Sequence, residues 1–200
     1  MAVLDFYFDF ASTYSYPAAV RIGALAEAAG VTLRWRPFLL GPIFKAQGLE
    51  TSPFNLFPVK GRYMVRDIER LCADLDLAFR LPDPFPQHSL LAGRVGMVGV
   101  AEGWIARFAP ALYRAEFAER RRIDDPAVVG DVLAGLGLDP QATLARAQSD
   151  EIKGALRAAT EAAQNAGVFG APSFVTEKGE LFWGNDRLEQ ALAWAARGRA

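Results

Sequence analysis

The period of apolar and polar positions changes twice in the first part of the chain. Residues 3–8 are rich in β-branched and aromatic side chains, which predicts a strand. Residues 14–29 place apolar side chains three and four positions apart, which predicts a helix with one buried face, and Gly30 follows as its stop. Residues 31–37 alternate between apolar and polar and predict a second strand. Such a β-α-β unit indicates two parallel strands joined by a right-handed crossover.

After the second predicted strand, the sequence pattern changes from strands to loops and helices. Gly41 and Pro42 and the proline-bounded segment 53–58 are expected to form loops, followed by a helix over residues 59–77. Residues 81–86 are expected to be extended, because a residue before proline is pushed out of the α region. Further helices are expected over residues 89–108, 109–119, 126–136 and 140–165.

The last part of the chain returns to strand-like patterns. Residues 174–176 and 181–183 predict a short hairpin around a tight turn, and residues 186–197 predict an amphipathic helix. Upstream, Asp125 and Asp139 each stand directly before a proline, which is typical of a helix start. The predicted order is therefore β-α-β, a long helical insert, and β-β-α.

Composition narrows the class of protein. The 200 residues are 52% hydrophobic and 22% charged, which is typical of a globular chain, and the net charge of −1 argues against nucleic acid as a partner. Cys72 is the single cysteine and His88 the single histidine, so neither a disulfide within the chain nor a metal cluster of these residues is expected. Cys72 lies among leucines of a predicted helix, which favours a buried structural thiol.

The location follows from two further features. The first residues lead directly into the first strand, without the pattern of a signal peptide. Apolar runs stay well below the roughly 20 residues that span a bilayer. We therefore expect a soluble, cytoplasmic protein without a membrane partner.

The junction between the first strand and the first helix carries the candidate chemistry. Backbone N–H groups without helical partners and the positive end of the helix dipole favour an anion there. A thioredoxin-type redox enzyme would carry Cys-x-x-Cys, whereas this chain has Ser12-Thr13-Tyr14-Ser15. The spacing therefore points to a thiol that arrives with a cofactor, for which glutathione is the candidate, and the helix end would favour its thiolate. A plain helix-capping role for Ser12 is the alternative, and Ser15 is expected to contribute packing.

Three segments together carry a resemblance to a known family: residues 5–16, 167–174 and 183–188. In order and spacing they resemble the kappa-class glutathione transferases and bacterial 2-hydroxychromene-2-carboxylate isomerases, which are relatives of the disulfide oxidase DsbA. The resemblance implies an α/β protein, a thioredoxin-like fold with a large inserted all-α domain, and a homodimer. The domains expected are residues 1–38 with 166–200 for the thioredoxin-like part and 39–165 for the insert.

The resemblance also implies roles for single residues. Ser12 would donate a hydrogen bond to the glutathione thiolate and act as the catalytic residue. Ala171 and a cis Pro172 would present backbone groups to the cysteinyl part of glutathione, although an ordinary loop proline is the alternative. Asn185 and Asp186 would hold the γ-glutamyl end, a role compatible with capping the last helix.

Weaker matches complete the expected site. Lys60 would meet the glycyl carboxylate with Asn55 as its polar companion, and His88 would reach the substrate as a proton donor near neutral pH. Each of these is equally compatible with a solvated surface position. The family's proline after the serine is replaced by Thr13, which predicts a less rigid turn. Aromatic and aliphatic candidates for the substrate wall, which are equally compatible with the core, are Phe38, Leu39, Phe44 and Trp104.

The function implied is that of a glutathione-dependent isomerase in aromatic catabolism. It would convert 2-hydroxychromene-2-carboxylate to trans-o-hydroxybenzylidenepyruvate by reversible addition of the thiolate, so that glutathione is not consumed. A kappa-like glutathione transferase or peroxidase would use the same site on another small aromatic or electrophilic substrate. A redox-inactive thioredoxin-fold module that binds peptides along the Ala171 edge remains a third reading of the missing cysteines.

Overall fold

A four-stranded mixed sheet forms the centre of the computed structural model, which describes residues 2–198. The strand order is β2-β1-β3-β4, where β1 is Ala2–Phe8, β2 is Val31–Pro37, β3 is Ser173–Thr176 and β4 is Leu181–Trp183. β1 runs parallel to β2, whereas β3 is antiparallel to both β1 and β4. The predicted parallel β-α-β unit and the late hairpin are therefore observed.

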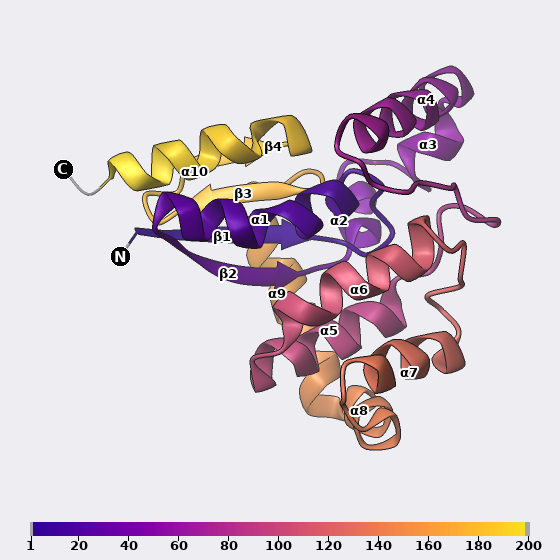
Figure 1. Ribbon diagram of the computed structural model, residues 1–200. Coiled ribbons are helices and arrows are strands. Elements are labelled where there is room, and N and C mark those ends of the chain that lie inside the picture. Colours follow the sequence, from indigo (N-terminus) through magenta and orange to yellow (C-terminus); the bar gives the residue numbers. More distant parts are fainter. Residues whose placement is uncertain (1, 199–200) are drawn as a thin grey trace.

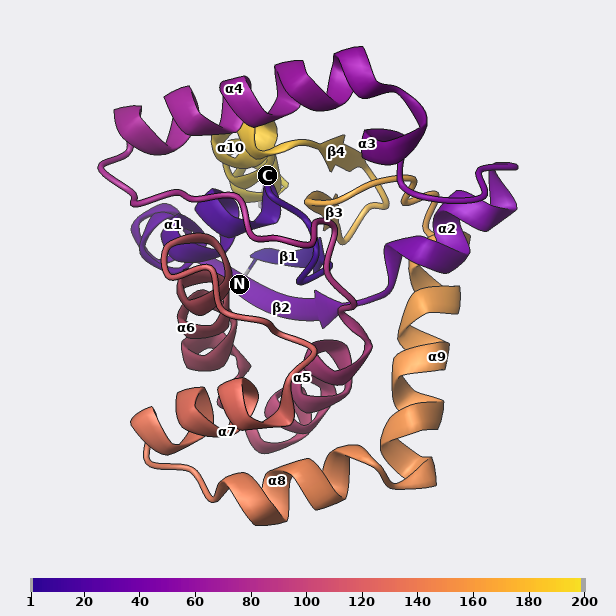
Figure 2. The same ribbon diagram turned by 90° about the vertical axis from the view of Figure 1, so that its right-hand side faces the viewer.

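Helices cover both faces of this sheet (Figures 1 and 2). Helices α1 (Ser15–Ala29) and α10 (Leu188–Arg197) pack on the face that carries Leu4, Phe6 and Phe8. The opposite face meets α2 (Leu40–Ala46) and α9 (Asp150–Asn165) through a second apolar cluster. That cluster contains Tyr7, Phe38, Ile43, Ala163, Val168 and Val175. Six of the seven residues of β1 are aliphatic or aromatic, and the seventh, Asp5, pairs with Arg34. This composition is typical of a strand that is covered on both faces.

The remaining helices lie beyond one end and one edge of the sheet (Figure 1). Their bounds are α3 Pro53–Leu56, α4 Pro58–Asp74, α5 Leu90–Glu102, α6 Ile105–Phe117, α7 Pro126–Gly135 and α8 Pro140–Ala147. Asp125 and Asp139 accept hydrogen bonds from the first turns of α7 and α8, so both predicted helix starts are confirmed.

Two segments predicted to be loops are helical. Gly41 and Pro42 belong to the first turn of α2, where the missing proline N–H has no helical acceptor to lose. Residues 53–58 contain α3 and the start of α4. Ser52 caps α3 by accepting a hydrogen bond from the Phe54 N–H at 3.3 Å. Proline in the first helical turn misled the prediction in α2, α3 and α4.

Two predicted helices are divided differently. The break between α5 and α6 falls at Gly103, whose φ of 80° ends α5, and Pro110 lies inside α6 instead of starting a helix. The segment predicted as one helix over 140–165 separates into α8 and α9, because Ser149 accepts a hydrogen bond from the Ile152 N–H and begins a new helix. Residues 81–86 contain no helix, but they bend at cis peptides before Pro84 and Pro86 and are not straight.

The last helix begins in two stages. Asn185–Arg187 forms a 3-10 turn, and α10 follows at Leu188. Neither Asn185 nor Asp186 makes a side-chain capping bond, so the capping role predicted for them is wrong. Gly184 before the turn has a φ of 107°, and a Cβ there would lie 2.5 Å from an Asp186 carboxylate oxygen. This position therefore requires glycine.

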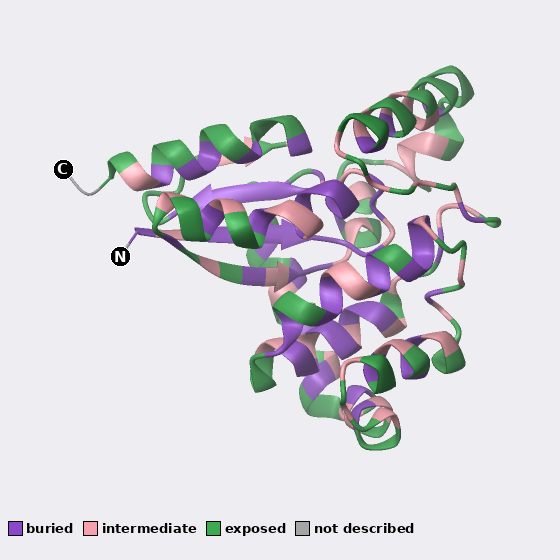
Figure 3. Ribbon diagram, viewed as in Figure 1, coloured by how far each residue is buried: buried purple, intermediate pink, exposed green. Residues whose placement is uncertain are grey.

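The buried residues lie mainly in the sheet and on the helix faces that pack against the core (Figure 3). Cys72 is fully buried on α4, as predicted, and burial raises the pKa of its thiol to about 11, which disfavours the reactive thiolate. Within residues 2–198, none of the helices combines the length and apolar character that a membrane crossing requires.

Candidate functional site

A tight turn places Ser12 at the carboxyl end of β1. The Asp9 carboxylate accepts hydrogen bonds from the Ala11 N–H at 2.9 Å and from the Leu40 N–H at 2.6 Å. The Asp9 carbonyl accepts the Ser12 N–H at 2.9 Å. An aspartate that bonds the backbone two residues ahead replaces a backbone turn, so Asp9 sets the path from strand to helix. Asp9 is buried, and this desolvation raises the pKa of its carboxyl group against the opposing effect of its hydrogen bonds.

Ser12 and Ala171 lie side by side although 159 residues separate them. The Ser12 hydroxyl donates to the Ala171 carbonyl at 3.0 Å and accepts the Ser15 N–H at 3.3 Å. The peptide between Ala171 and Pro172 is cis, as predicted. The hydroxyl therefore accepts a hydrogen bond from the first residue of α1 and also faces the cis-proline loop.

Several backbone donors at this point have no acceptor within the part of the chain that the structure describes. They are the N–H groups of Thr13 and Tyr14, which directly follow Ser12, and of Ala171, whose carbonyl accepts from the Ser12 hydroxyl. The first two belong to the amino end of α1, where the helix dipole is positive. Together with the hydroxyl, these donors suit an anion such as a thiolate and an extended backbone paired with Ala171.

Helix α4 is held against the start of α1. The Tyr14 hydroxyl donates to the Asp67 carboxylate at 2.7 Å, and burial followed by this bond raises the pKa of Tyr14. Lys60, in the first turn of α4, is exposed and its ammonium lies 5.1 Å above the Phe57 ring. Asn55, on α3, is exposed and donates to the Thr51 hydroxyl at 3.2 Å. Both residues thus stand on the helical layer next to the Ser12 turn, without contact to it in this structure.

The other predicted pair lies at the start of α10. Asn185 is buried, and its side-chain oxygen accepts a hydrogen bond from Arg21 of α1 at 3.0 Å. Asp186 is exposed and lies 3.3 Å from the Arg187 guanidinium. The Gly184 N–H just before this pair donates to the Pro172 carbonyl at 2.9 Å, so the start of the 3-10 turn lies next to the cis-proline loop.

His88 lies on the segment before α5 and is exposed. The side chain of the next residue, Ser89, opposes the rise in the pKa of the Asp9 carboxyl group, so this segment passes close to the Ser12 turn. Two of the proposed wall residues are part of the core instead: Phe38 belongs to the second apolar cluster, and Trp104 packs on Gly99. These two aromatic side chains therefore contribute to the core, which is one of the two alternatives that the sequence left open.

Sequence reasoning missed three residues that shape this corner. Asp9 was detectable, since an aspartate three positions before a strand-helix junction is a turn signal. Arg21 and Glu116 could not be detected from the sequence, because the residues around them belong to elements that are distant along the chain. Glu116, on α6, is fully buried with both carboxylate oxygens unpartnered, and burial followed by the charge of Asp9 raises the pKa of its carboxyl group well above the usual range.

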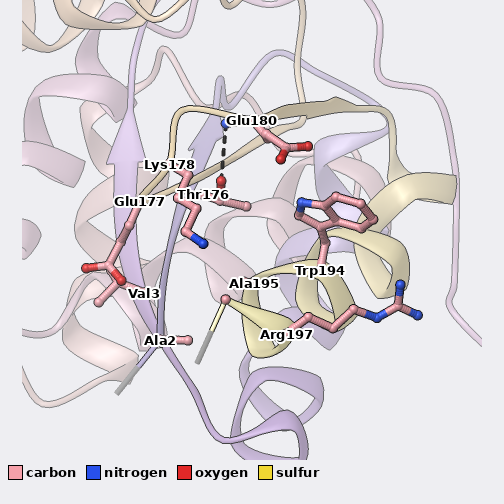
Figure 4. Close-up of a pocket in the computed structure, with 10 residues that line it drawn as sticks. Ala2, Val3, Thr176, Glu177, Lys178, Glu180, Trp194, Ala195 and Arg197 are labelled. Atoms are coloured by element: carbon pink, nitrogen blue, oxygen red, sulfur yellow. Dashed lines mark hydrogen bonds between the residues drawn. The ribbon is translucent and has the colours of Figure 1, made fainter. Parts of the chain in front are cut away.

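A sizeable surface hollow lies at the other end of the sheet (Figure 4). It is bordered by Ala2 and Val3 at the start of β1, by the turn after Thr176, and by Trp194 of α10. Ser12 follows the opposite end of β1, and the hollow contains no residue of the three sequence motifs. We assign it no part in the chemistry.

Fold and site together define a thioredoxin-type protein in which Ser12-Thr13-Tyr14-Ser15 lies at the junction between β1 and α1. Residues 3–193 match the family model described as the DSBA-like thioredoxin domain. The chain therefore belongs to the DSBA-like thioredoxin family. The predicted family and the α/β thioredoxin-like fold with its helical insertion are confirmed.

Two kinds of protein are similar to this chain over nearly its whole length. The chain is 30% identical to 2-hydroxychromene-2-carboxylate isomerase of Sphingobium xenophagum over 93% of this chain and 94% of that protein. It is 27% identical to glutathione S-transferase kappa 2 of Caenorhabditis elegans, over 97% and 92% respectively. The solved structure of a 2-hydroxychromene-2-carboxylate isomerase is similar with a TM-score of 0.85 and 28% identity, over 98% of this chain and 95% of that one. Both groups of relatives are named as enzymes.

Proposed function

We propose that the protein is a glutathione-dependent isomerase of the 2-hydroxychromene-2-carboxylate type. Glutathione, when bound, supplies a thiolate that adds reversibly to a conjugated carbon of a small aromatic substrate and is regenerated. The observation that carries the proposal is the Ser12 hydroxyl, 3.0 Å from the Ala171 carbonyl and beside unpaired N–H groups at the start of α1. The similarity to isomerases over nearly the whole chain supports it.

The residues present fit glutathione along its length. Ser12 and the amino end of α1 suit the sulfur, and the half-buried Ala171 offers a free N–H to the cysteinyl backbone. Asn185 and Asp186 suit the carboxylate and ammonium of the γ-glutamyl end, while Lys60 with Asn55 suits the glycyl carboxylate. In this assignment the Ser12 hydroxyl turns from the Ala171 carbonyl toward the sulfur, which leaves that carbonyl free to accept from glutathione. His88 is proposed as a proton donor at the substrate side.

A glutathione transferase of kappa type is the second candidate. The alignment with one kappa transferase covers 97% of this chain, and the alignment with another covers slightly less. The two functions share every residue assigned above and differ in whether glutathione is consumed. An assay of free glutathione during turnover separates them. A constant concentration supports the isomerase, and a stoichiometric loss with an electrophile supports the transferase.

Calorimetric titration with reduced glutathione, with thiolate ultraviolet absorbance recorded alongside, tests the proposal. We expect saturable binding with thiolate formation near pH 7. Lys60→Ala and Asp186→Ala are each expected to weaken binding about tenfold, because each removes a charge-assisted contact of about 1.5 kcal/mol. Lys178→Ala, an exposed lysine at the far end of the sheet, is the control and should bind as the natural protein does.

Two results would contradict the assignment. Absence of binding at millimolar glutathione would remove the cofactor and leave a peptide-binding module along the Ala171 edge as the better function. If Lys60→Ala and Asp186→Ala both bind glutathione as tightly as the natural protein, the two terminal subsites are assigned wrongly, although glutathione is still the cofactor.

The proposal includes a homodimer in the cytoplasm. Apolar side chains are exposed together on α3 and the start of α4, namely Leu56, Phe57, Val59 and Tyr63. Such a group of exposed apolar residues is typical of an interface. Sedimentation equilibrium is expected to give twice the mass of one chain, and a single-chain mass at micromolar concentration would contradict this part of the proposal.

A further inference from the structure

Arg21, on α1, connects this helix with the start of α10. One guanidinium nitrogen donates to the Asn185 side-chain oxygen at 3.0 Å, and the other donates to the Glu189 carboxylate at 2.6 Å. The Glu189 contact is an ion pair with a half-exposed carboxylate. The Asn185 contact is enclosed, since Asn185 is only 4% exposed. The two contacts of one side chain therefore differ in their surroundings.

The contact with Arg21 determines which end of the Asn185 amide faces which way. A guanidinium carries only donors, so the atom that meets it is the amide oxygen and the amide nitrogen points away from it. That nitrogen makes no hydrogen bond within the described residues, and the protein does not fully enclose it. It is thus both oriented and free to donate to a ligand.

We propose that Arg21 is a positioning residue that orients the Asn185 amide toward the γ-glutamyl carboxylate of glutathione. This inference rests on the proposed function. Without Arg21, the amide can rotate and present its oxygen, which would repel a carboxylate in place of binding it. Because Arg21 belongs to α1, the same rigid helix positions the thiol end at Ser12 and the γ-glutamyl end at Asn185.

A comparison of two thiol ligands tests the inference. Glutathione contains the γ-glutamyl residue, whereas cysteinylglycine lacks it and retains the thiol and the glycyl carboxylate. Arg21→Met keeps much of the aliphatic stem and is expected to weaken glutathione binding about tenfold, with cysteinylglycine binding unchanged within twofold. Glu189→Gln, which removes the ion pair and leaves the Asn185 contact, should bind both ligands as the natural protein does.

A double-variant cycle isolates the route through Asn185. In an Asn185→Ala background, Arg21→Met is expected to cause no further loss of glutathione affinity, because the group that it orients is gone. Arg21→Lys keeps a charge opposite Glu189 without the second nitrogen, and it provides the same comparison if the methionine variant unfolds.

The outcomes separate this inference from the proposed function. A natural protein that fails to bind glutathione removes both. Binding by the natural protein with equal affinity in Arg21→Met overturns the inference alone. Equal losses for glutathione and cysteinylglycine, or an equal loss in Glu189→Gln, would also overturn it, because they would show that Arg21 only joins two helices.

Discussion

Replacement of Ser12 by alanine is expected to lower turnover about 100-fold while glutathione affinity changes little. The hydroxyl stands beside unpaired N–H groups at the start of α1 and within 3.0 Å of the Ala171 carbonyl. A hydrogen bond to a charged acceptor contributes about 1.5–3 kcal/mol, so its loss raises the pKa of the bound thiol by roughly one to two units. Because neutral glutathione loses no such bond, binding below that pKa is maintained.

Thiolate absorbance as a function of pH measures this effect directly. The titration curve of glutathione bound to Ser12→Ala should lie at higher pH than the curve for the natural protein. Ser15→Ala is the matched control, because Ser15 occupies the other cysteine position and is fully buried. Superimposable titration curves for the natural protein and Ser12→Ala would reduce Ser12 to a helix cap.

The local pattern of the chain predicted most of the fold. Residues 3–8 and 31–37 lie within the observed strands, because the central strand has a strong β-branched and aromatic signal and the edge strand β2 alternates between apolar and polar residues. Errors occurred where proline and glycine have two meanings. Pro42 and Pro53 lie in the first turns of helices, where proline is favoured, and Gly103 ends one helix inside a continuous apolar pattern.

The candidate site was predictable where it depends on short motifs and not where it depends on distant partners. Ser12 and Pro172 belong to local segments, and the observed cis peptide follows the predicted one. The distant partners of Asn185 and Asp9 come from α1 and α2. No spacing along the chain indicates such contacts, since they arise only when the sheet brings distant segments together.

Replacement of Glu116 by glutamine is expected to stabilise the protein at neutral pH. The Glu116 carboxyl group is fully buried on α6, and neither oxygen has a hydrogen-bond partner. Burial, followed by the nearby Asp9, raises its pKa well above the usual range, so the folded protein keeps the proton. In the unfolded chain the group ionises near pH 4.3. Folding at pH 7 therefore requires proton uptake, which lowers the free energy of unfolding.

The sign of the pH dependence follows from proton binding. Below about pH 4.3 both states carry the proton, and the natural protein and Glu116→Gln should be nearly equal in stability. As the pH rises toward the folded-state pKa, the folded state holds more protons than the unfolded state, so the natural protein loses up to about 1.4 kcal/mol per pH unit through this group. The variant lacks this loss, and its advantage should grow with pH.

Urea unfolding from pH 4 to pH 8 measures the difference between the two proteins. Asp9, which also has a raised pKa, and Tyr113, whose hydroxyl donates to the Asp9 carbonyl at 2.8 Å, are present in both and contribute equally. Glu161→Gln, an exposed glutamate of α9, is the control and should follow the natural protein at every pH. Parallel curves for the natural protein and Glu116→Gln would mean that Glu116 is ionised in the folded state. Such a charge would need a partner that the enclosed carboxylate does not have among the described residues, so divergence with rising pH is the outcome that the geometry requires.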